Sequence, residues 1–163
     1  MHLKHSLEIF IHDDSEYLIL GSFPSVKSRE LGFYYSHPRN RFFLVLSSIF
    51  NEEYSSSIDE RKEFLKRHKI ALYDVIEECG IIGSDDSSIK NVIHIDIKCI
   101  LKKYPNIKRI GITGKKAGAL FDKYLKDKVN IEVAYLPSTS PANAKASLNE
   151  LVGNYKELLK DIQ

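Results

Sequence analysis

The 163-residue chain holds only two cysteines, Cys79 and Cys99, and this scarcity limits its chemistry. Two thiols cannot form a disulfide framework, and an iron–sulfur cluster usually takes four thiolates. We therefore expect no iron–sulfur cluster and two buried thiols. His2 and His5 have a spacing seen in metal sites, but no carboxylate or thiolate follows at a suitable spacing. A frayed terminus is the prediction there, with no metal ion or other cofactor.

Long apolar segments are absent too. No apolar run approaches the roughly 20 residues of a membrane span, and charged residues are spread through residues 1–14, unlike a signal peptide. We expect a cytoplasmic protein with no membrane partner. No repeat or linker divides the chain, and the turn-rich stretch 83–88 is too short to separate two domains. A single domain over residues 1–163 is the prediction.

Several catalytic motifs and a strong excess of charge are also missing. The chain has neither a G-x-S-x-G elbow nor an H-E-x-x-H helix, which disfavours a serine-triad or zinc hydrolase. The segment Thr113-Gly114-Lys115-Lys116 lacks the first glycine and the hydroxyl of a P-loop. The net charge of +2 does not identify a nucleic-acid binder, so any DNA contact must come from local clusters such as Arg39 with Arg41.

What is present is a pattern of alternating strands and helices. Apolar runs predict strands at residues 17–21, 70–76, 107–112 and 131–136, and three of these runs are nearly continuous, as in strands buried on both faces of a parallel sheet. Residues 7–12 are predicted as a further edge strand.

Helical periodicity marks residues 42–50, 117–125 and 148–162, with shorter helices around 64–65 and 96–104. Ser140 as N-cap and Pro141 at the first helical position predict where the last helix begins. The alternation predicts a three-layer α/β/α sandwich with a mainly parallel four-stranded central sheet. Ligands of such sheets lie beyond the carboxyl ends of the strands.

An aromatic insert follows the first predicted strand. Phe33, Tyr34 and Tyr35 lie in a loop that leads to Arg39 and Asn40. Loop aromatics next to arginine suit base stacking and phosphate contact, although such rings also plug cores; we expect at least one ring in each role. By propensity alone Asn40 is more often an N-cap than a catalytic group. His37, in the same loop, is by itself more often a structural histidine than a base.

A second polar loop follows the last predicted strand. Ser138, Thr139 and Ser140 offer three hydroxyls next to free backbone N–H groups. This combination suits a phosphate seat, and it also suits helix capping; the two functions are compatible.

Five segments, taken together and in order, resemble the uracil-DNA glycosylase superfamily, and within it the hypoxanthine-DNA (deoxyinosine) glycosylase family. The resemblance covers roughly residues 17 to 159 and is carried by residues 21–25, 32–43, 71–75, 111–117 and 136–144. It implies a DNA repair enzyme that extrudes a deaminated base from the helix and hydrolyses its bond to the sugar.

The resemblance also assigns residues. Phe23 stands where mismatch-specific uracil enzymes have a water-positioning Asn, and Ser25 replaces a glycine of the same motif. The hypoxanthine branch has its important Asn in the H-P-x-N segment, which implies that Asn40 is catalytic. A related loop wedges a bulky residue into DNA, where this chain has Ala142 and Asn143. The implied base-binding residues are Ser22, Phe23, Phe33, Tyr35 and His37, and the implied DNA-binding residues are Ser25, Arg39, Lys115, Ser138, Thr139, Ser140, Ala142 and Asn143.

The expected reaction leaves an abasic site without strand cleavage, because no lysine nucleophile matches. We expect a monomer whose partner is DNA containing a deaminated base, most of all hypoxanthine. Three alternatives stay open: a uracil- or xanthine-directed glycosylase, a non-catalytic module that binds damaged or single-stranded DNA, and a nucleotide-binding enzyme that acts on small substrates.

Overall fold

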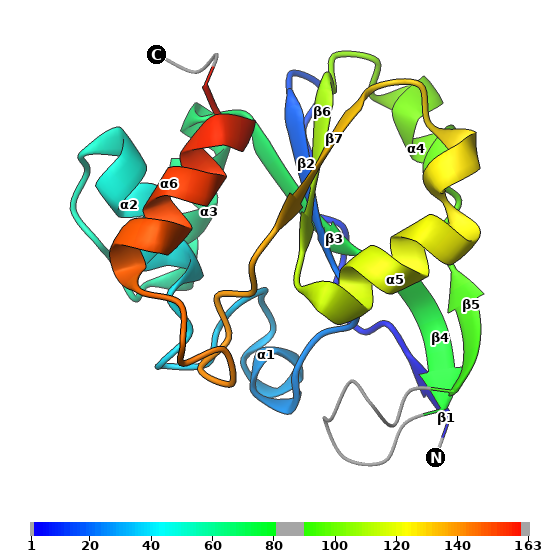
Figure 1. The fold of residues 1–163 in the computed structure, drawn as a ribbon, viewed down its shortest axis with the longest axis horizontal. Helices are drawn as coiled ribbons and strands as arrows, with labels where there is room; N and C mark the ends of the chain where they lie inside the picture. Colours follow the sequence, from blue (N-terminus) through cyan, green and yellow to red (C-terminus); the bar gives the residue numbers. More distant parts are fainter. Residues whose placement is uncertain (1, 81–89, 161–163) are drawn as a thin grey trace.

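A computed structural model describes residues 2–80 and 90–160 (Figure 1). Its core is a parallel sheet of order β3-β2-β6-β7, which confirms the predicted four-stranded sheet. The strands are β2 (Tyr17–Gly21), β3 (Ile70–Asp74), β6 (Arg109–Thr113) and β7 (Glu132–Leu136). The predicted turn-rich stretch 83–88 and the end of the predicted last helix lie outside the described residues.

The central strand β2 is buried along its whole length because it pairs on both sides and is covered on both faces. Its register with β3 places Gly21 opposite Asp74, and its register with β6 places Leu20 opposite Ile112. Since parallel strands end at the same edge of a sheet, Gly21, Asp74 and Thr113 come together at that edge.

Helices cover both faces of the sheet, which confirms the three-layer sandwich (Figure 1). One core cluster joins Tyr17, Ile19 and Leu72 to the helices on one face, and a second joins Leu18 and Leu20 to those on the other. The first face carries α2 (Phe42–Phe50), α3 (Ile58–Arg67) and α6 (Leu148–Leu158), and the second carries α4 (Ile97–Lys103) and α5 (Lys115–Tyr124).

A second, antiparallel sheet of order β1-β4-β5 was not predicted. It consists of β1 (His2–Lys4), β4 (Ile76–Gly80) and β5 (Lys90–His94). The predicted frayed terminus is therefore wrong: β1 pairs with β4, and His2 bonds to Glu78 at 2.9 Å. The predicted strand 70–76 contains the whole of β3, in the parallel sheet, and the first residue of β4, in the antiparallel sheet.

Other boundaries also differ from the prediction. Residues 7–12 form only an isolated antiparallel bridge, between Phe10 and Leu72, and no strand. The short helix α1 (Val26–Leu31), capped by Ser25, was not predicted. Cys79 is buried as expected, but Cys99 is exposed. None of the helices in the described part of the chain has the length and apolar content that a membrane crossing requires.

The last helix begins at Leu148 and not at Pro141. Ser147 caps it by accepting a 3.1 Å hydrogen bond from the N–H of Glu150, and the pair has the S-x-x-E pattern of a capping box. Residues 140–147 form turns and bends instead of helix. The carbonyls of Asn143 and Ala146 in this loop accept hydrogen bonds from Arg41.

Candidate active site

A cavity of about 280 Å³ opens at the carboxyl ends of the central strands. In Figure 1 three connecting segments meet below this edge: the region of α1, the loop before α2 and the orange loop before α6. Residues from the ends of β2, β3 and β6 line the inner part. The lining consists of Gly21, Ser22, Phe23, Pro24, Ser25, Ser28, Tyr34, Tyr35, His37, Asn40, Asp74, Thr113, Ser138, Thr139, Ser140 and Pro141.

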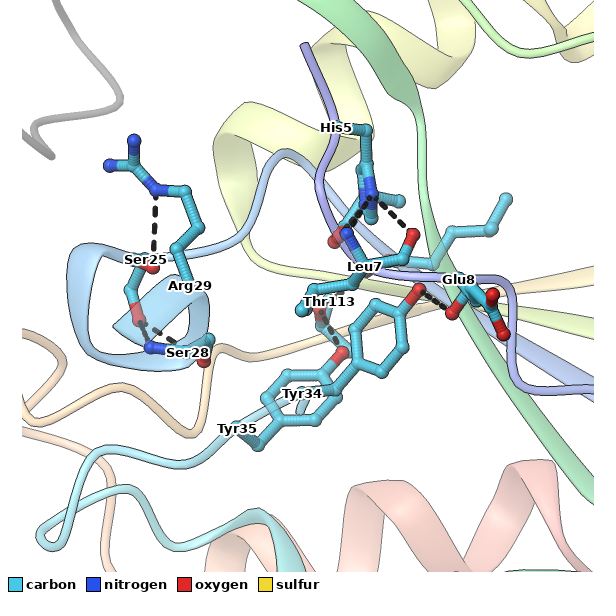
Figure 2. Close-up of polar contacts among 11 residues, drawn as sticks. His5, Leu7, Glu8, Ser25, Ser28, Arg29, Tyr34, Tyr35 and Thr113 are labelled. Atoms are coloured by element: carbon cyan, nitrogen blue, oxygen red, sulfur yellow. Dashed lines mark hydrogen bonds and ion pairs between the residues drawn. The ribbon is translucent and has the colours of Figure 1, made fainter. Parts of the chain in front are cut away.

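Tyr35 supplies an aromatic surface in this cavity. Its ring stacks on Phe42, with centroids 3.9 Å apart and planes 13° apart, so Phe42 covers one face. A φ of 55° turns the chain at Tyr35 and directs the ring inward, where its hydroxyl lies 3.4 Å from that of Thr113 (Figure 2). Burial, with the charge of Asp74, raises the pKa of Tyr35 well above its ordinary range, so the phenol stays neutral. A flat ligand would meet the ring on the side that Phe42 leaves open.

Asn40 borders the same cavity and has a fixed orientation. Its Oδ1 accepts one hydrogen bond from the N–H of Phe42 at 2.9 Å and another from the hydroxyl of Thr139 at 2.8 Å. The predicted N-cap at Asn40 is wrong by one residue: Arg41 is the N-cap of α2, and Asn40 precedes it while its oxygen bonds the N–H of Phe42. Because both bonds use the amide oxygen, the Nδ2 group is the end left to donate, and it has no hydrogen-bond partner among the described residues.

The inner wall contains an acid that the sequence did not single out. Asp74 ends β3, is 5% exposed and lines the cavity. Its Oδ2 lies 2.8 Å from Nε2 of His5, whose side chain is 1% exposed. The sequence signal that could have identified Asp74 is its position, since it is a carboxylate at the carboxyl end of a buried parallel strand, where ligands bind in such sheets.

The three loop aromatics divide as expected between core and cavity, but not all as assigned. Phe33 is 3% exposed and packs against Phe10, Tyr34 and Phe43 in the core, away from the cavity lining. Its predicted base-binding role is therefore corrected. Tyr34, which was not assigned to the site, borders the cavity and donates a 2.7 Å hydrogen bond to the carbonyl of Glu8 (Figure 2). Of the predicted base-binding residues, the cavity brings together Ser22, Phe23, Tyr35 and His37.

The predicted DNA-binding residues other than Arg39 lie in two places. Ser25, Ser138, Thr139 and Ser140 line the cavity, although Thr139 is 1% exposed and its hydroxyl serves Asn40. A wider groove of about 960 Å³ adjoins the cavity, because Ser138 and Ser140 line both. Lys115, Ala142 and Asn143 also line this groove.

Two of these side chains and one neighbour stabilise the loops that carry them. Ser25 caps α1 through a 3.1 Å bond from the N–H of Ser28. Asn143 donates from Nδ2 to the carbonyl of Ser138 at 2.9 Å. Arg41 donates hydrogen bonds to the carbonyls of Ala146 and Asn143. Its guanidinium therefore stabilises the loop before α6 and is not free to contact a phosphate. Arg39 is exposed and does not line the cavity.

The cavity offers uncharged donors, one carboxylate and aromatic surface. Among residues 2–80 and 90–160, no three His, Cys, Asp or Glu side chains come together in a way that could hold a metal ion. The residues present can bind a planar ring with a polar edge, and they place an amide donor at its border.

Comparison with known proteins identifies the family of the chain. No family model matches the chain. The hypoxanthine DNA glycosylase of Methanosarcina barkeri is 34% identical over 158 residues, which is 96% of this chain and 98% of that protein. A protein of the same name from Methanosarcina acetivorans is 31% identical over 148 residues, 90% of this chain and 92% of that one.

A solved structure has the same fold. A solution NMR structure from Methanosarcina acetivorans, described as a candidate uracil DNA glycosylase, superposes with a TM-score of 0.81 at 28% identity and covers 97% of this chain and 99% of its own. These comparisons confirm the resemblance drawn from the motifs. On the identity and coverage of its relatives, the chain belongs to the hypoxanthine DNA glycosylase family.

Proposed function

We propose that this protein excises hypoxanthine from DNA by hydrolysing the N-glycosidic bond of a deoxyinosine turned out of the helix. The products are the free base and an abasic site. The observation that carries the proposal is the Asn40 amide, which borders a base-sized cavity with its oxygen held and its Nδ2 group left to donate.

A base inside a duplex cannot reach a cavity at the edge of a sheet, so the nucleotide must leave the stack. This costs a few kcal/mol, and less for a mispaired base such as hypoxanthine opposite thymine. Stacking on Tyr35, which is backed by Phe42, recovers part of that cost. The ring of Phe23 also lines the cavity and adds apolar surface.

Breaking the C1′–N bond leaves its electron pair on the departing base, and the sugar carbon becomes electron-poor. A water oxygen then bonds to C1′, and one of its protons leaves to the base or to solvent. A fixed donor stabilises charge as it develops, because it needs no reorganisation at that moment. We assign this donor function to Nδ2 of Asn40, directed at the departing base, where the negative charge develops.

The groove beside the cavity suits the strand on either side of the extruded nucleotide. Lys115 lies at the start of α5, and Ser138 and Ser140 connect the groove to the cavity. Lysine charge and hydroxyl groups are typical of phosphate contacts, which position a duplex without identifying its bases. We propose that this groove holds the DNA backbone.

The decisive experiment measures release of free base from a duplex with one deoxyinosine, under excess enzyme. Wild type should release hypoxanthine, and Asn40→Ala should lose roughly 100-fold or more in rate, the scale for one oriented donor. Asn40→Asp should lose as much, because it replaces the donor with an acceptor. Asn149→Ala, an exposed change on α6, is the matched control.

Two outcomes would contradict the proposal. Lesion binding by wild type without any product would favour the non-catalytic binding module. An Asn40→Asp variant at least as fast as wild type would show that position 40 activates water as an acceptor instead of donating. Since Asn40 also bonds the N–H of Phe42 at the start of α2, thermal unfolding must show that the variants fold; the lost hydrogen bond costs about 1 kcal/mol. Duplexes with uracil and xanthine, run alongside, test base preference.

A further inference from the structure

The glycosylase proposal does not use the buried carboxylate of Asp74. Its side chain is 7% exposed, yet it lines the cavity at the inner end of β3. Every other side chain on that wall is neutral or aromatic, apart from His37 nearer the loop. Leaving a carboxylate in so dry a place is costly unless something pairs with it.

The two carboxylate oxygens have different surroundings. Oδ2 takes a hydrogen bond from Nε2 of His5 at 2.8 Å, while Nδ1 of His5 is 3.2 Å from the N–H of Leu7 and 2.9 Å from its carbonyl. A carboxylate only accepts, so Nε2 carries a proton whichever way Nδ1 is used. Oδ1 accepts no hydrogen bond from the described residues. It is not among the fully buried unpaired atoms either, so it reaches the cavity.

Oδ1 lies directly against the chain at Gly21. A Cβ built on Gly21 would be 2.6 Å from it, and 3.5 Å and 3.7 Å from the hydroxyls of Thr113 and Tyr35. This close approach, with His5 behind the other oxygen, fixes the direction of the acceptor. Burial, and next the charge of Asp74, raise the pKa of Tyr34 and Tyr35, so both phenols stay neutral beside the carboxylate.

Depth decides which part of a base Asp74 would meet. Asn40 and Thr139 lie on the loops at the border of the cavity, whereas Asp74 lies on the sheet itself. The sugar remains attached to DNA and stays at the border. The inner wall therefore meets the edge of the base farthest from the glycosidic bond, which in hypoxanthine carries N1 and C2.

Deamination changes the chemistry of that edge. Adenine has a bare N1 that accepts a hydrogen bond, and hypoxanthine has an N1–H that donates one; cytosine and uracil differ in the same way at N3. We propose that Oδ1 of Asp74 accepts the ring N–H that deamination creates, and so selects lactam bases over adenine and cytosine. This assignment rests on the proposed glycosylase function and adds the basis of its selectivity.

The reason for selectivity is an unpaired acceptor. With adenine in place, Oδ1 would face the N1 lone pair, and both would lose their water partners without gaining a bond. A carboxylate has no donor to offer, and the hydrogen bond from His5 keeps the other oxygen, Oδ1, directed at the cavity. The intact base is therefore disfavoured because two hydrogen-bond acceptors face each other, and not because of its size.

Equilibrium binding tests this without relying on turnover. The probes are duplexes with a hydrolysis-resistant 2′-fluorinated nucleotide bearing hypoxanthine, adenine or unsubstituted purine, each opposite an abasic analogue so that pairing strength does not vary. Wild type should bind the hypoxanthine duplex roughly 10- to 100-fold more tightly than either of the others. In Asp74→Asn the amide oxygen faces His5 and NH₂ faces the cavity, so the preference should fall within about threefold or reverse toward adenine.

Asp74→Ala is the second variant, since it adds no donor, and its preference should also fall within about threefold. Asp14→Asn, on an exposed turn, is the matched control and should keep the full preference. Equal wild-type affinity for hypoxanthine and purine would overturn the assignment, as would an undiminished preference in a folded Asp74 variant. Failure of base release from ordinary deoxyinosine with preference intact would instead refute the glycosylase function alone.

Discussion

The hydroxyl of Thr139 donates a 2.8 Å hydrogen bond to Oδ1 of Asn40, across 99 positions of sequence. Thr139 is 1% exposed, so this bond is shielded from water. It joins the loop after β7 to the loop before α2. With the bond from Phe42, it leaves Nδ2 of Asn40 as the free end of the amide. One buried hydroxyl thus sets the orientation of the group on which the proposed chemistry depends.

Removing that hydroxyl should loosen the amide. Thr139→Val keeps the shape but leaves Oδ1 of Asn40 with one bond instead of two. We expect about 1 kcal/mol lower free energy of unfolding and roughly tenfold slower base release. Urea unfolding and single-turnover base release measure the two effects. Thr139→Ser, which keeps the hydroxyl, should restore most of the rate, and a slow Thr139→Ser with a fast Thr139→Val would refute this role.

Stacking on Tyr35 should matter more than its hydroxyl. Tyr35→Ala removes the ring that Phe42 supports, and base stacking on an aromatic ring contributes about 1–3 kcal/mol. We therefore expect roughly 10- to 100-fold weaker binding of lesion DNA and slower base release. Tyr35→Phe loses only the 3.4 Å contact with Thr113 and should stay within about threefold of wild type. Equal defects in both variants would argue against stacking.

Glycine at position 21 is required by the carboxylate beside it. Gly21→Ala would bring a Cβ within 2.6 Å of Oδ1 of Asp74, and the hydrogen bond to His5 limits how far that side chain can retreat. We expect a loss of about 1–3 kcal/mol in stability together with loss of base release. Gly153→Ala is the contrasting change, since Gly153 lies on the exposed face of α6 and nothing lies within 4 Å of a Cβ built there. It should stabilise the protein by about 0.5–1 kcal/mol and leave activity unchanged.

Acid should remove the two ion pairs of Glu16 at the opposite edge of the sheet. The hydrogen bond from Lys108, assisted by Lys69, lowers the pKa of Glu16 below its ordinary value of 4.5, against the opposing effect of burial. Because the folded pKa is lowered, this stabilisation is present above the unfolded pKa and is lost as the pH falls through the folded pKa. The contribution is small, because both lysines are exposed to solvent, which screens their charges.

The variant Glu16→Gln tests this prediction. Its free energy of unfolding should fall less than that of wild type between about pH 5 and pH 3, measured by urea titration at each pH. Glu157→Gln, an exposed change on α6, should leave the wild-type slope unchanged. Parallel pH profiles for wild type and Glu16→Gln would contradict the assignment.

Local patterns predicted much of the fold because its strands are buried on both faces. Continuous apolar runs such as Tyr17–Gly21 have few alternatives in a chain of this size, and the helix at Phe42–Phe50 has clear periodicity. The sheet β1-β4-β5 was missed because its strands are short and largely polar, and because β1 pairs with a strand far away in the sequence. The helix start predicted at Ser140 was wrong because a Ser-Pro pair also begins turns, and Ser147 with Glu150 was the better capping signal.

The sequence by itself determined the order of the four parallel strands and of the helices that cover them, the edge of the sheet where a ligand is expected, and the motifs that placed Asn40 in the candidate site. Only the tertiary structure decided which aromatic faces the cavity, since Phe33 and Tyr35 are two positions apart in one loop and differ in backbone geometry and packing. It also placed Oδ1 of Asp74 next to the backbone of Gly21, and it placed His5 within hydrogen-bond distance of Oδ2. Such contacts depend on strand register and on a terminal segment 69 residues away, and no local pattern encodes them.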